Sequence, residues 1–189
     1  MWHRKLVIAL ASCLIIASVV FAQHDEWNEL NRQVVKLQQE GKYAEATKVA
    51  EKSLQMAEKT FGSDNANVAA SLNTLAELYR SQKIYSTAEA LYKRSLAIYE
   101  KALGPDHPEV ATSLNNLAEL CRLQRRYSEA EPLYKRSLTI YEKAFGQDHP
   151  AVASSLSKLA QMYKQMANEK EAPECEECPQ RIERPKQNP

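Results

Sequence analysis

The chain has 189 residues, of which 44% are hydrophobic and 26% are charged, and its 25 basic residues nearly balance 24 acidic residues. These proportions exclude collagen-like, mostly disordered and many-pass membrane proteins, and the neutral balance lacks the basic excess of nucleic-acid-binding proteins, so we expect no nucleic-acid partner. With 4 glycines and 4 cysteines, glycine-rich phosphate loops and a disulfide framework are also excluded.

The N-terminal segment, residues 1–22, reads as a signal peptide. A basic start at residues 3–5 is followed by residues 6–21, which carry no charge, and a small residue, Ala22, ends the segment. We therefore expect cleavage after Ala22 and an exported protein, either periplasmic or secreted. Two alternatives stay open. Residues 6–21 approach the length that spans a bilayer and could remain as a membrane anchor, and residues 10–13 resemble a lipoprotein signal.

A 42-residue period organises the rest of the chain. Residues 68–109 and 110–151 are identical at 30 of 42 aligned positions. Such self-similarity indicates tandem duplication of one structural unit. A more divergent copy occupies residues 26–67, and a half-copy occupies residues 152–168.

Each copy is predicted to form two helices. In the first helix, apolar residues recur at i, i+3, i+4 and i+7, as at Leu72, Leu75, Ala76 and Tyr79. The second helix carries a wider stripe with tyrosines for which we expect core positions: Tyr92, Tyr99, Tyr134 and Tyr141. Because a two-helix unit cannot bury both of its faces alone, the units must stack on one another.

Repeated residues mark the expected helix ends. Three equivalent glycines suit the left-handed conformation that ends a helix: Gly62, Gly104 and Gly146. Pro108 and Pro150 suit the first helical position of the next unit. Ser-x-x-Glu patterns at Ser86 and Ser128 predict capping boxes that start the second helices.

A resemblance to a known family rests on the run VATSLNNLAELCRLQRRYSEAEPLYKRSLTIYEKAFGQDHPAVA. This run is similar to the 42-residue tetratricopeptide repeat of the kinesin-light-chain type, and the resemblance covers about residues 26–167. It implies an all-α fold, a right-handed α-solenoid of antiparallel helix pairs, with about three repeats and a terminal capping helix. It also implies that the first helix of each pair lines a concave peptide-binding groove, without catalysis or a cofactor.

Two departures from the family pattern stand out. Cys121 replaces the tyrosine found at Tyr79 and Tyr163, and Lys83 and Arg125 replace the glycine that is usual between the two helices.

Polar residues recur on the side of each first helix that adjoins its apolar core stripe. We expect them to form ladders along the groove and to contact a protein or peptide ligand: Asn31, Asn73, Glu77, Arg80, Asn115, Glu119, Arg122, Ser157, Gln161 and Lys164. Asparagine amides can both donate to and accept from an extended peptide backbone, and arginines can hold carboxylates of an acidic ligand. The alternative is that these residues are solvated and shared by ancestry, with Glu–Arg pairs neutralising each other.

No catalytic residue and no metal site is expected. His107 and His149 lie in repeated Asp-His-Pro turns, where we expect them to start helices, because Asn65 occupies the equivalent position. Cys175 and Cys178 form a C-x-x-C pattern that lacks the second ligand pair of a zinc site. We expect a local disulfide or no role for this pair, with an intermolecular bridge or a metal as alternatives. Residues 169–189 contain 4 prolines and one isolated isoleucine and are predicted to be disordered.

Three functional hypotheses follow from these patterns. The first is an exported scaffold that binds a protein or peptide on its concave face. The second is a structural, self-associating module, attached to a membrane only if the N-terminal segment is not cleaved. The third, more remote, is a redox or metal role of the cysteine-containing tail.

Overall fold

The computed structural model describes the backbone of residues 23–177 and the side chains of residues 23–168. The predicted signal peptide or anchor at residues 1–22, and Cys178 of the predicted disulfide, lie outside the described residues. The described chain contains only helices. These are a helix of residues 23–39, α2 (Tyr43–Phe61), α3 (Ala66–Ser81), α4 (Tyr85–Leu103), α5 (Pro108–Leu123), α6 (Tyr127–Phe145) and α7 (Pro150–Glu177).

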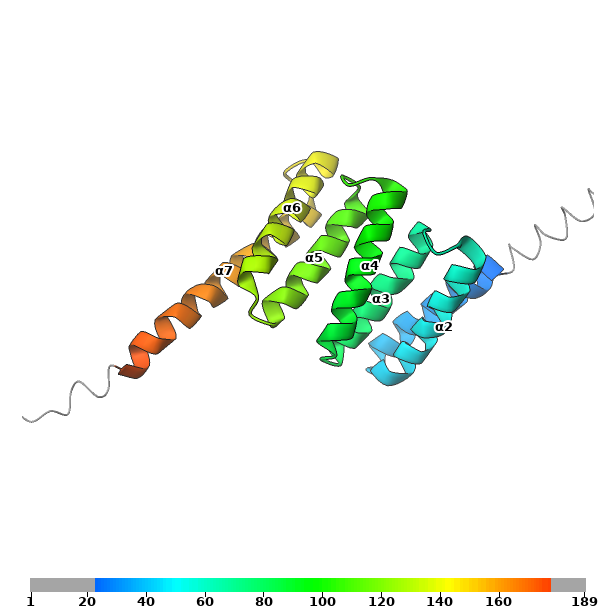
Figure 1. Ribbon diagram of the computed structural model, residues 1–189, viewed down its shortest axis with the longest axis horizontal. Helices are drawn as coiled ribbons and strands as arrows, with labels where there is room; N and C mark the ends of the chain where they lie inside the picture. Colours follow the sequence, from blue (N-terminus) through cyan, green and yellow to red (C-terminus); the bar gives the residue numbers. More distant parts are fainter. Residues whose placement is uncertain (1–22, 178–189) are drawn as a thin grey trace, which may run out of the picture.

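The helices form pairs that stack in chain order into an elongated array (Figure 1). α3 packs on α4 and α5 on α6, and each second helix also packs on the first helix of the following unit, α4 on α5 and α6 on α7. The two ends of the described chain lie at opposite ends of the array (Figure 1). The predicted all-α solenoid of helix pairs is therefore confirmed. Among the described residues, no helix is both long and apolar enough to cross a membrane.

The predicted first-helix stripe lies in the core. Leu72 and Ala76, and their equivalents Leu114 and Ala118, are 0% exposed. The second-helix tyrosines are core residues as expected: Tyr92, Tyr99, Tyr134 and Tyr141 are all buried. Small side chains at the contact between paired helices let the helix axes approach closely, and the large tyrosines fill the space between units.

The first helices begin as the sequence predicts. Asn65 accepts a hydrogen bond from the backbone N–H of Asn67 at 2.9 Å, and Nδ1 of His107 accepts one from Glu109 at 3.2 Å. His149 accepts the same bond from Ala151. The two histidines therefore satisfy backbone donors at helix starts, which is the role expected for them. α5 and α7 begin at Pro108 and Pro150.

The second helices begin differently from the prediction. α4 and α6 have Ile84 and Arg126 at their N-caps, neither of which makes a capping side-chain bond, so Ser86 and Ser128 lie inside the helices and the predicted capping boxes are wrong. Glu89, the glutamate of the first predicted box, instead accepts hydrogen bonds from Arg126 at 2.6 and 3.3 Å. Hydrogen bonds from Arg126 and then Lys93 lower the pKa of Glu89 to about 2.

Arg126 also compensates for the tyrosine hydroxyl that is missing at Cys121. One unit later, the Tyr163 hydroxyl donates to Glu131 at 2.7 Å. Glu89 stands at the position equivalent to Glu131, and a thiol at Cys121 does not replace the tyrosine hydroxyl as its donor. Arg126 supplies hydrogen bonds to Glu89 instead. The substitution at Cys121 is thus compensated within the same unit.

The turn between the two helices of a unit requires a positive φ at one position. Gly41, Lys83 and Arg125 occupy it, with φ of 73°, 63° and 60°. A lysine or arginine is strained in this conformation, because its Cβ approaches the backbone, whereas glycine is not. The glycines that end the second helices also have positive φ, with Gly104 at φ 91° and ψ 158°, a region that only glycine populates readily.

Within the described residues, the last unit has no turn between a first and a second helix, and α7 continues through the equivalent position. Ala167 lies 42 residues after Arg125, inside α7, and α7 reaches 28 residues where α3 and α5 each have 16. α7 thus includes residues 169–177 of the predicted tail, and residues 178–189 lie outside the described residues. Alanine is the best helix former and disfavours a left-handed turn, so the chain continues as a helix at this point.

Repeated polar contacts tie the helices together. Ser95 and Ser137 of the second helices donate at 2.8 Å to the backbone carbonyls of Ala69 and Ala111 in the first helices of their own units. Between units, the ion pair Arg94–Glu58 at 2.6 Å recurs as Arg136–Glu100 at 2.7 Å.

The first unit is attached to the second by a tryptophan. The Trp27 indole packs edge-on against Phe61 and donates to Ser71 Oγ at 3.0 Å. This anchor compensates for the weaker apolar stripe of the helix at residues 23–39, in which Val34 is fully buried and Leu37 only partly.

Because no described helix follows α7, the same Leu→Ala substitution should have unequal effects on stability at two equivalent positions. Leu114→Ala removes a fully buried side chain and should lower the free energy of unfolding by about 2–4 kcal/mol, because it leaves a cavity. Leu156→Ala, at a position that is 48% exposed, should cost less than about 1 kcal/mol. Urea denaturation followed by circular dichroism measures both, and equal losses would contradict the described packing.

Candidate functional site

The predicted polar face is mostly a seam between successive first helices. Asn73 and Asn115 are 9% and 5% exposed, and each amide Nδ2 donates across the seam, to Ser113 Oγ at 2.9 Å and Ser155 Oγ at 2.8 Å. Their Oδ1 atoms are buried without a hydrogen-bond partner. Each asparagine therefore connects two units, and its amide is buried in the seam.

A buried network crosses the seam between α5 and α7. Arg122, 8% exposed, donates to both carboxylate oxygens of Glu119 at 2.8 and 2.6 Å and to Gln165 Oε1 of α7 at 2.5 Å. The Tyr134 hydroxyl donates to the same carboxylate at 2.7 Å. Burial disfavours the charged form of Glu119, but the hydrogen bonds from Arg122 and Tyr134 outweigh it and lower the pKa of Glu119. Burial, and then the bond to Glu119, raise the pKa of Tyr134.

The equivalent network one unit earlier is incomplete. Arg80 corresponds to Arg122, but Leu123 stands where Gln165 follows in the last unit, and a leucine cannot accept a hydrogen bond. The buried Nε of Arg80 and the buried hydroxyl of Tyr92 have no hydrogen-bond partner among the described residues. Burial raises the pKa of Tyr92, so this hydroxyl stays neutral. The Nε–H of Arg80 is therefore a buried donor without an acceptor in the described part of the chain, while the charge of the guanidinium helps to lower the pKa of Glu119 in the next unit.

The remaining predicted site residues have different surroundings. Asn31 accepts from Ser53 Oγ at 2.8 Å and lines a hollow of about 540 Å³ at the N-terminal end of the array. Glu77 accepts from Asn116 across the seam at 3.4 Å. The three predicted residues of α7, Ser157, Gln161 and Lys164, are exposed. The structure thus brings Glu119 and Arg122 together, and ligand binding by the ten predicted residues stays a prediction.

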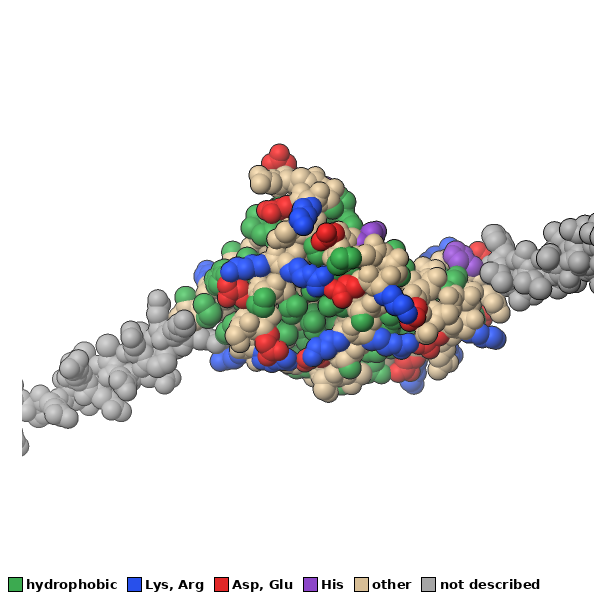
Figure 2. Space-filling model, turned by 45° about the horizontal axis from the view of Figure 1, so that its top comes forward, with side chains coloured by type: hydrophobic (Ala, Val, Ile, Leu, Met, Phe, Trp, Pro, Cys, Tyr) green, Lys and Arg blue, Asp and Glu red, His purple; other side chains and the backbone are tan. Residues whose placement is uncertain are grey.

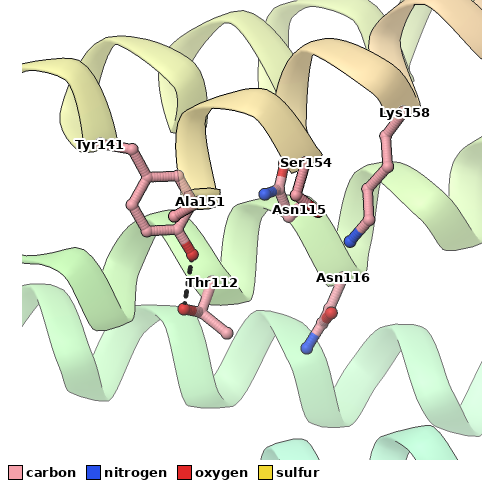
Figure 3. Close-up of a pocket in the computed structure, with 7 residues that line it drawn as sticks. All are labelled: Thr112, Asn115, Asn116, Tyr141, Ala151, Ser154 and Lys158. Carbon is pink, nitrogen blue, oxygen red and sulfur yellow. Dashed lines mark hydrogen bonds between the residues drawn. The ribbon is translucent and has the colours of Figure 1, made fainter. Parts of the chain in front are cut away.

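A polar recess of about 180 Å³ opens between α5 and α7. Its lining residues come from α5, α6 and α7: Thr112, Asn115, Asn116, Tyr141, Ala151, Ser154 and Lys158. Figure 3 shows the Lys158 side chain reaching from α7 toward Asn116 of α5. The hydroxyls of Thr112 and Tyr141 lie 2.7 Å apart and are hydrogen-bonded, which fixes one wall of the recess (Figure 3).

The sequence contains a signal for this recess that residue type alone did not reveal. Two of its lining positions differ in every copy of a nearly identical repeat, Ala70, Thr112 and Ser154 at one and Thr74, Asn116 and Lys158 at the other. The recess therefore combines Thr112, Asn116, Ser154 and Lys158 in a set that the earlier units do not contain.

The surface around the array carries mixed charge. Figure 2 shows acidic and basic side chains interspersed over one face, with apolar side chains between them. No cluster of three or more potential metal ligands occurs among the described residues. The chemistry that the recess offers is therefore hydrogen bonding by amides and hydroxyls, together with one ammonium group.

Because the Arg122 network is complete and the Arg80 network is not, an Arg→Ala substitution should have unequal effects on stability at the two positions. Arg122→Ala leaves Gln165 without its donor and Glu119 with only the Tyr134 hydroxyl, and should lower the free energy of unfolding by about 2–4 kcal/mol, since a partly buried carboxylate loses its charged partner. Arg80→Ala should cost less than half as much. Thermal or urea unfolding at pH 7 measures both.

The cost of Arg122→Ala should also depend on pH. Because the pKa of Glu119 is lowered in the folded chain, the pair stabilises the fold above the ordinary carboxyl pKa of about 4.3 and loses this contribution as the pH falls through the lowered pKa. A cost independent of pH would contradict the assigned network.

Comparison with known proteins gives a consistent result. The tetratricopeptide repeat family model matches residues 35–101, 85–143 and 125–178. Among solved structures, BtubC (BKLC) from P. vanneervenii has a TM-score of 0.68 at 20% identity, covering 86% of this chain and 68% of that one.

Two structures from Podosopora anserina, described as a putative kinesin light chain with nearly identical TPR-like repeats, are also similar. One has a TM-score of 0.68 at 25% identity, covering 86% of this chain and 78% of that one. The other, a variant with a single substitution, has a TM-score of 0.66 at 26% identity, covering 72% and 64%. No curated protein matches the chain. The stacked helix pairs, the 42-residue period and the family match together place this chain in the tetratricopeptide repeat family.

Proposed function

We propose that the chain is a non-enzymatic scaffold that binds a protein or peptide ligand on the face formed by its first helices. The family supports this, because tetratricopeptide repeats generally mediate protein–protein interactions. The observation that carries the proposal is the recess between α5 and α7, where the side chains of Asn116, Ser154 and Lys158 converge from two helices. Such a recess can accept one side chain of an extended segment that crosses the array.

The charges on this face favour a ligand with acidic side chains. Lys158 borders the recess and has no ion-pair partner among the described residues. A carboxylate of the ligand would supply that partner and accept hydrogen bonds from the neighbouring amide and hydroxyls. Arg122, in contrast, is held by Glu119, so we assign it to stability.

The residues at the recess do not suit catalysis. A nucleophile needs an adjacent base within hydrogen-bond reach, and the hydroxyl of Thr112 is paired with another hydroxyl, that of Tyr141. The two repeated histidines cap helices. These pairings favour recognition over chemistry.

Selection from a displayed library of random peptides on the immobilised chain tests the acidic preference. We expect selected peptides to be enriched in Asp and Glu and to bind at least about tenfold more weakly to Lys158→Glu, which is about 1.4 kcal/mol. Lys52→Glu on α2, an exposed charge reversal away from the recess, is the matched control and should leave affinity unchanged.

Circular dichroism of both variants checks that each remains helical. Selected peptides without acidic enrichment, or equal affinities for the chain and for Lys158→Glu, would argue against the recess as the binding site.

We also propose that the protein is exported, because residues 1–22 have the features of a cleavable signal. Expression in a bacterial host with an intact secretion system, followed by mass spectrometry of the purified protein, tests this. The expected mass corresponds to a chain that begins at Gln23. A mass that retains residues 6–21, with the protein in the membrane fraction, would support the anchored alternative.

A further inference from the structure

The outward side of α7 keeps core residues of the repeat but leaves them uncovered. Leu156 is 48% exposed, whereas its equivalents Leu72 and Leu114 are 0% exposed. Ala153 and Ala160 are exposed too, although the alanines at their equivalent positions in α3 and α5 are buried. In those units the following helix, α4 or α6, packs on the first helix. α7 contacts α6 of the preceding unit, but no described helix follows it.

The residues that follow lack the sequence pattern of a second helix. Counting by the 42-residue period, the second helix of this last unit would place Glu176 where Tyr92 and Tyr134 stand, Pro179 where Ser95 and Ser137 stand, and Glu183 where Tyr99 and Tyr141 stand. Charged and proline residues at these positions cannot form the apolar stripe that packs against a first helix.

We propose that a second copy of this chain covers the exposed side of α7, with the two α7 helices packed antiparallel about a two-fold axis near Lys158. In this arrangement Leu156 of each copy lies opposite Ala160 of the other, because both positions are two residues from the axis. A large side chain then meets a small one at each contact, which allows the close helix approach found within the repeats.

The charge distribution on α7 permits this pairing. From Pro150 to Lys164 the only charged residues are Lys158 and Lys164, and Lys158 lines the recess on another side of the helix. The exposed stripe therefore brings no carboxylate into the contact, and the exposed Lys164, one turn beyond Ala160, can keep its ammonium in water at the edge of the contact.

The opposite end of the array fits less well as the second surface. The hollow on the helix of residues 23–39 is lined by Asp25, Asn28, Asn31, Arg32 and Val35, of which only the last is apolar. Stacking α7 on this end would bury charges against an apolar stripe. It would also create a head-to-tail contact that can repeat without closing, whereas a two-fold contact closes at the dimer.

Sedimentation equilibrium of the full chain tests the proposal. We expect twice the chain mass at about 100 μM for the unaltered chain and a single-chain mass for Leu156→Glu, whose dissociation constant should rise at least about a hundredfold. Val35→Glu, which introduces the same charge at an apolar residue that is 51% exposed at the other end, is the matched control and should remain dimeric. Circular dichroism establishes that both variants keep their helices.

A swap of side-chain sizes tests the orientation. Leu156→Ala and Ala160→Leu should each weaken the dimer, and the double variant should restore it, because the antiparallel pairs again join one large and one small side chain. A monomeric unaltered chain, a dimeric Leu156→Glu variant, dissociation by Val35→Glu, or a double variant no tighter than the single ones would each overturn the proposal. The peptide selection does not depend on any of these results.

Discussion

The structure depends on one constraint, which is that a pair of amphipathic helices cannot bury both of its faces. Each second helix packs on its own first helix and on the first helix of the next unit, so the core of one unit is completed by its neighbour. This explains why Leu72 and Leu114 are fully buried and Leu156 is not, although all three occupy the same place in the repeat. Burial here is a property of position in the array, not of the local sequence.

The same constraint determines what the polar residues can do. Between successive first helices the contact is made through asparagine–serine bonds and the Glu119–Arg122–Gln165 network. Groups used in this seam are withdrawn from the surface, because a buried amide or guanidinium must be paired to offset the loss of its hydration. The proposed binding site therefore lies beside the seam, in the recess between α5 and α7.

The two ends of the array are chemically different, as expected where stacking stops. At the N-terminal end Trp27 closes the first unit against Phe61 and Ser71, and the outer hollow is mainly polar. At the other end α7 runs on as a single helix and keeps an apolar stripe without a cover among the described residues. The two ends therefore differ in the chemistry of the surface that they expose.

Several features of the fold could be predicted from the sequence. The 42-residue period determines the number and order of the helices, and the i, i+3, i+4, i+7 spacing identifies the buried stripe, because both follow from the geometry of a helix that must stack on its own copies. The helix-capping role of His107 was predictable too, since Asn65 stands in its place one unit earlier. The second-helix starts were not, because Glu89 could bond either to a nearby backbone N–H or to Arg126, and only the folded chain brings Arg126 within 2.6 Å.

The sequence by itself therefore determined that this protein is a stack of helix pairs and which stripe of each helix is apolar. Tertiary structure alone decided which polar side chains remain available to a ligand. Asn73 and Asn115 have the residue type and spacing of a binding ladder, yet the approach of the next first helix buries them against serines. Whether a side chain on one helix is free depends on the distance and rotation of the neighbouring helix, and the periodicity of a single helix does not specify either.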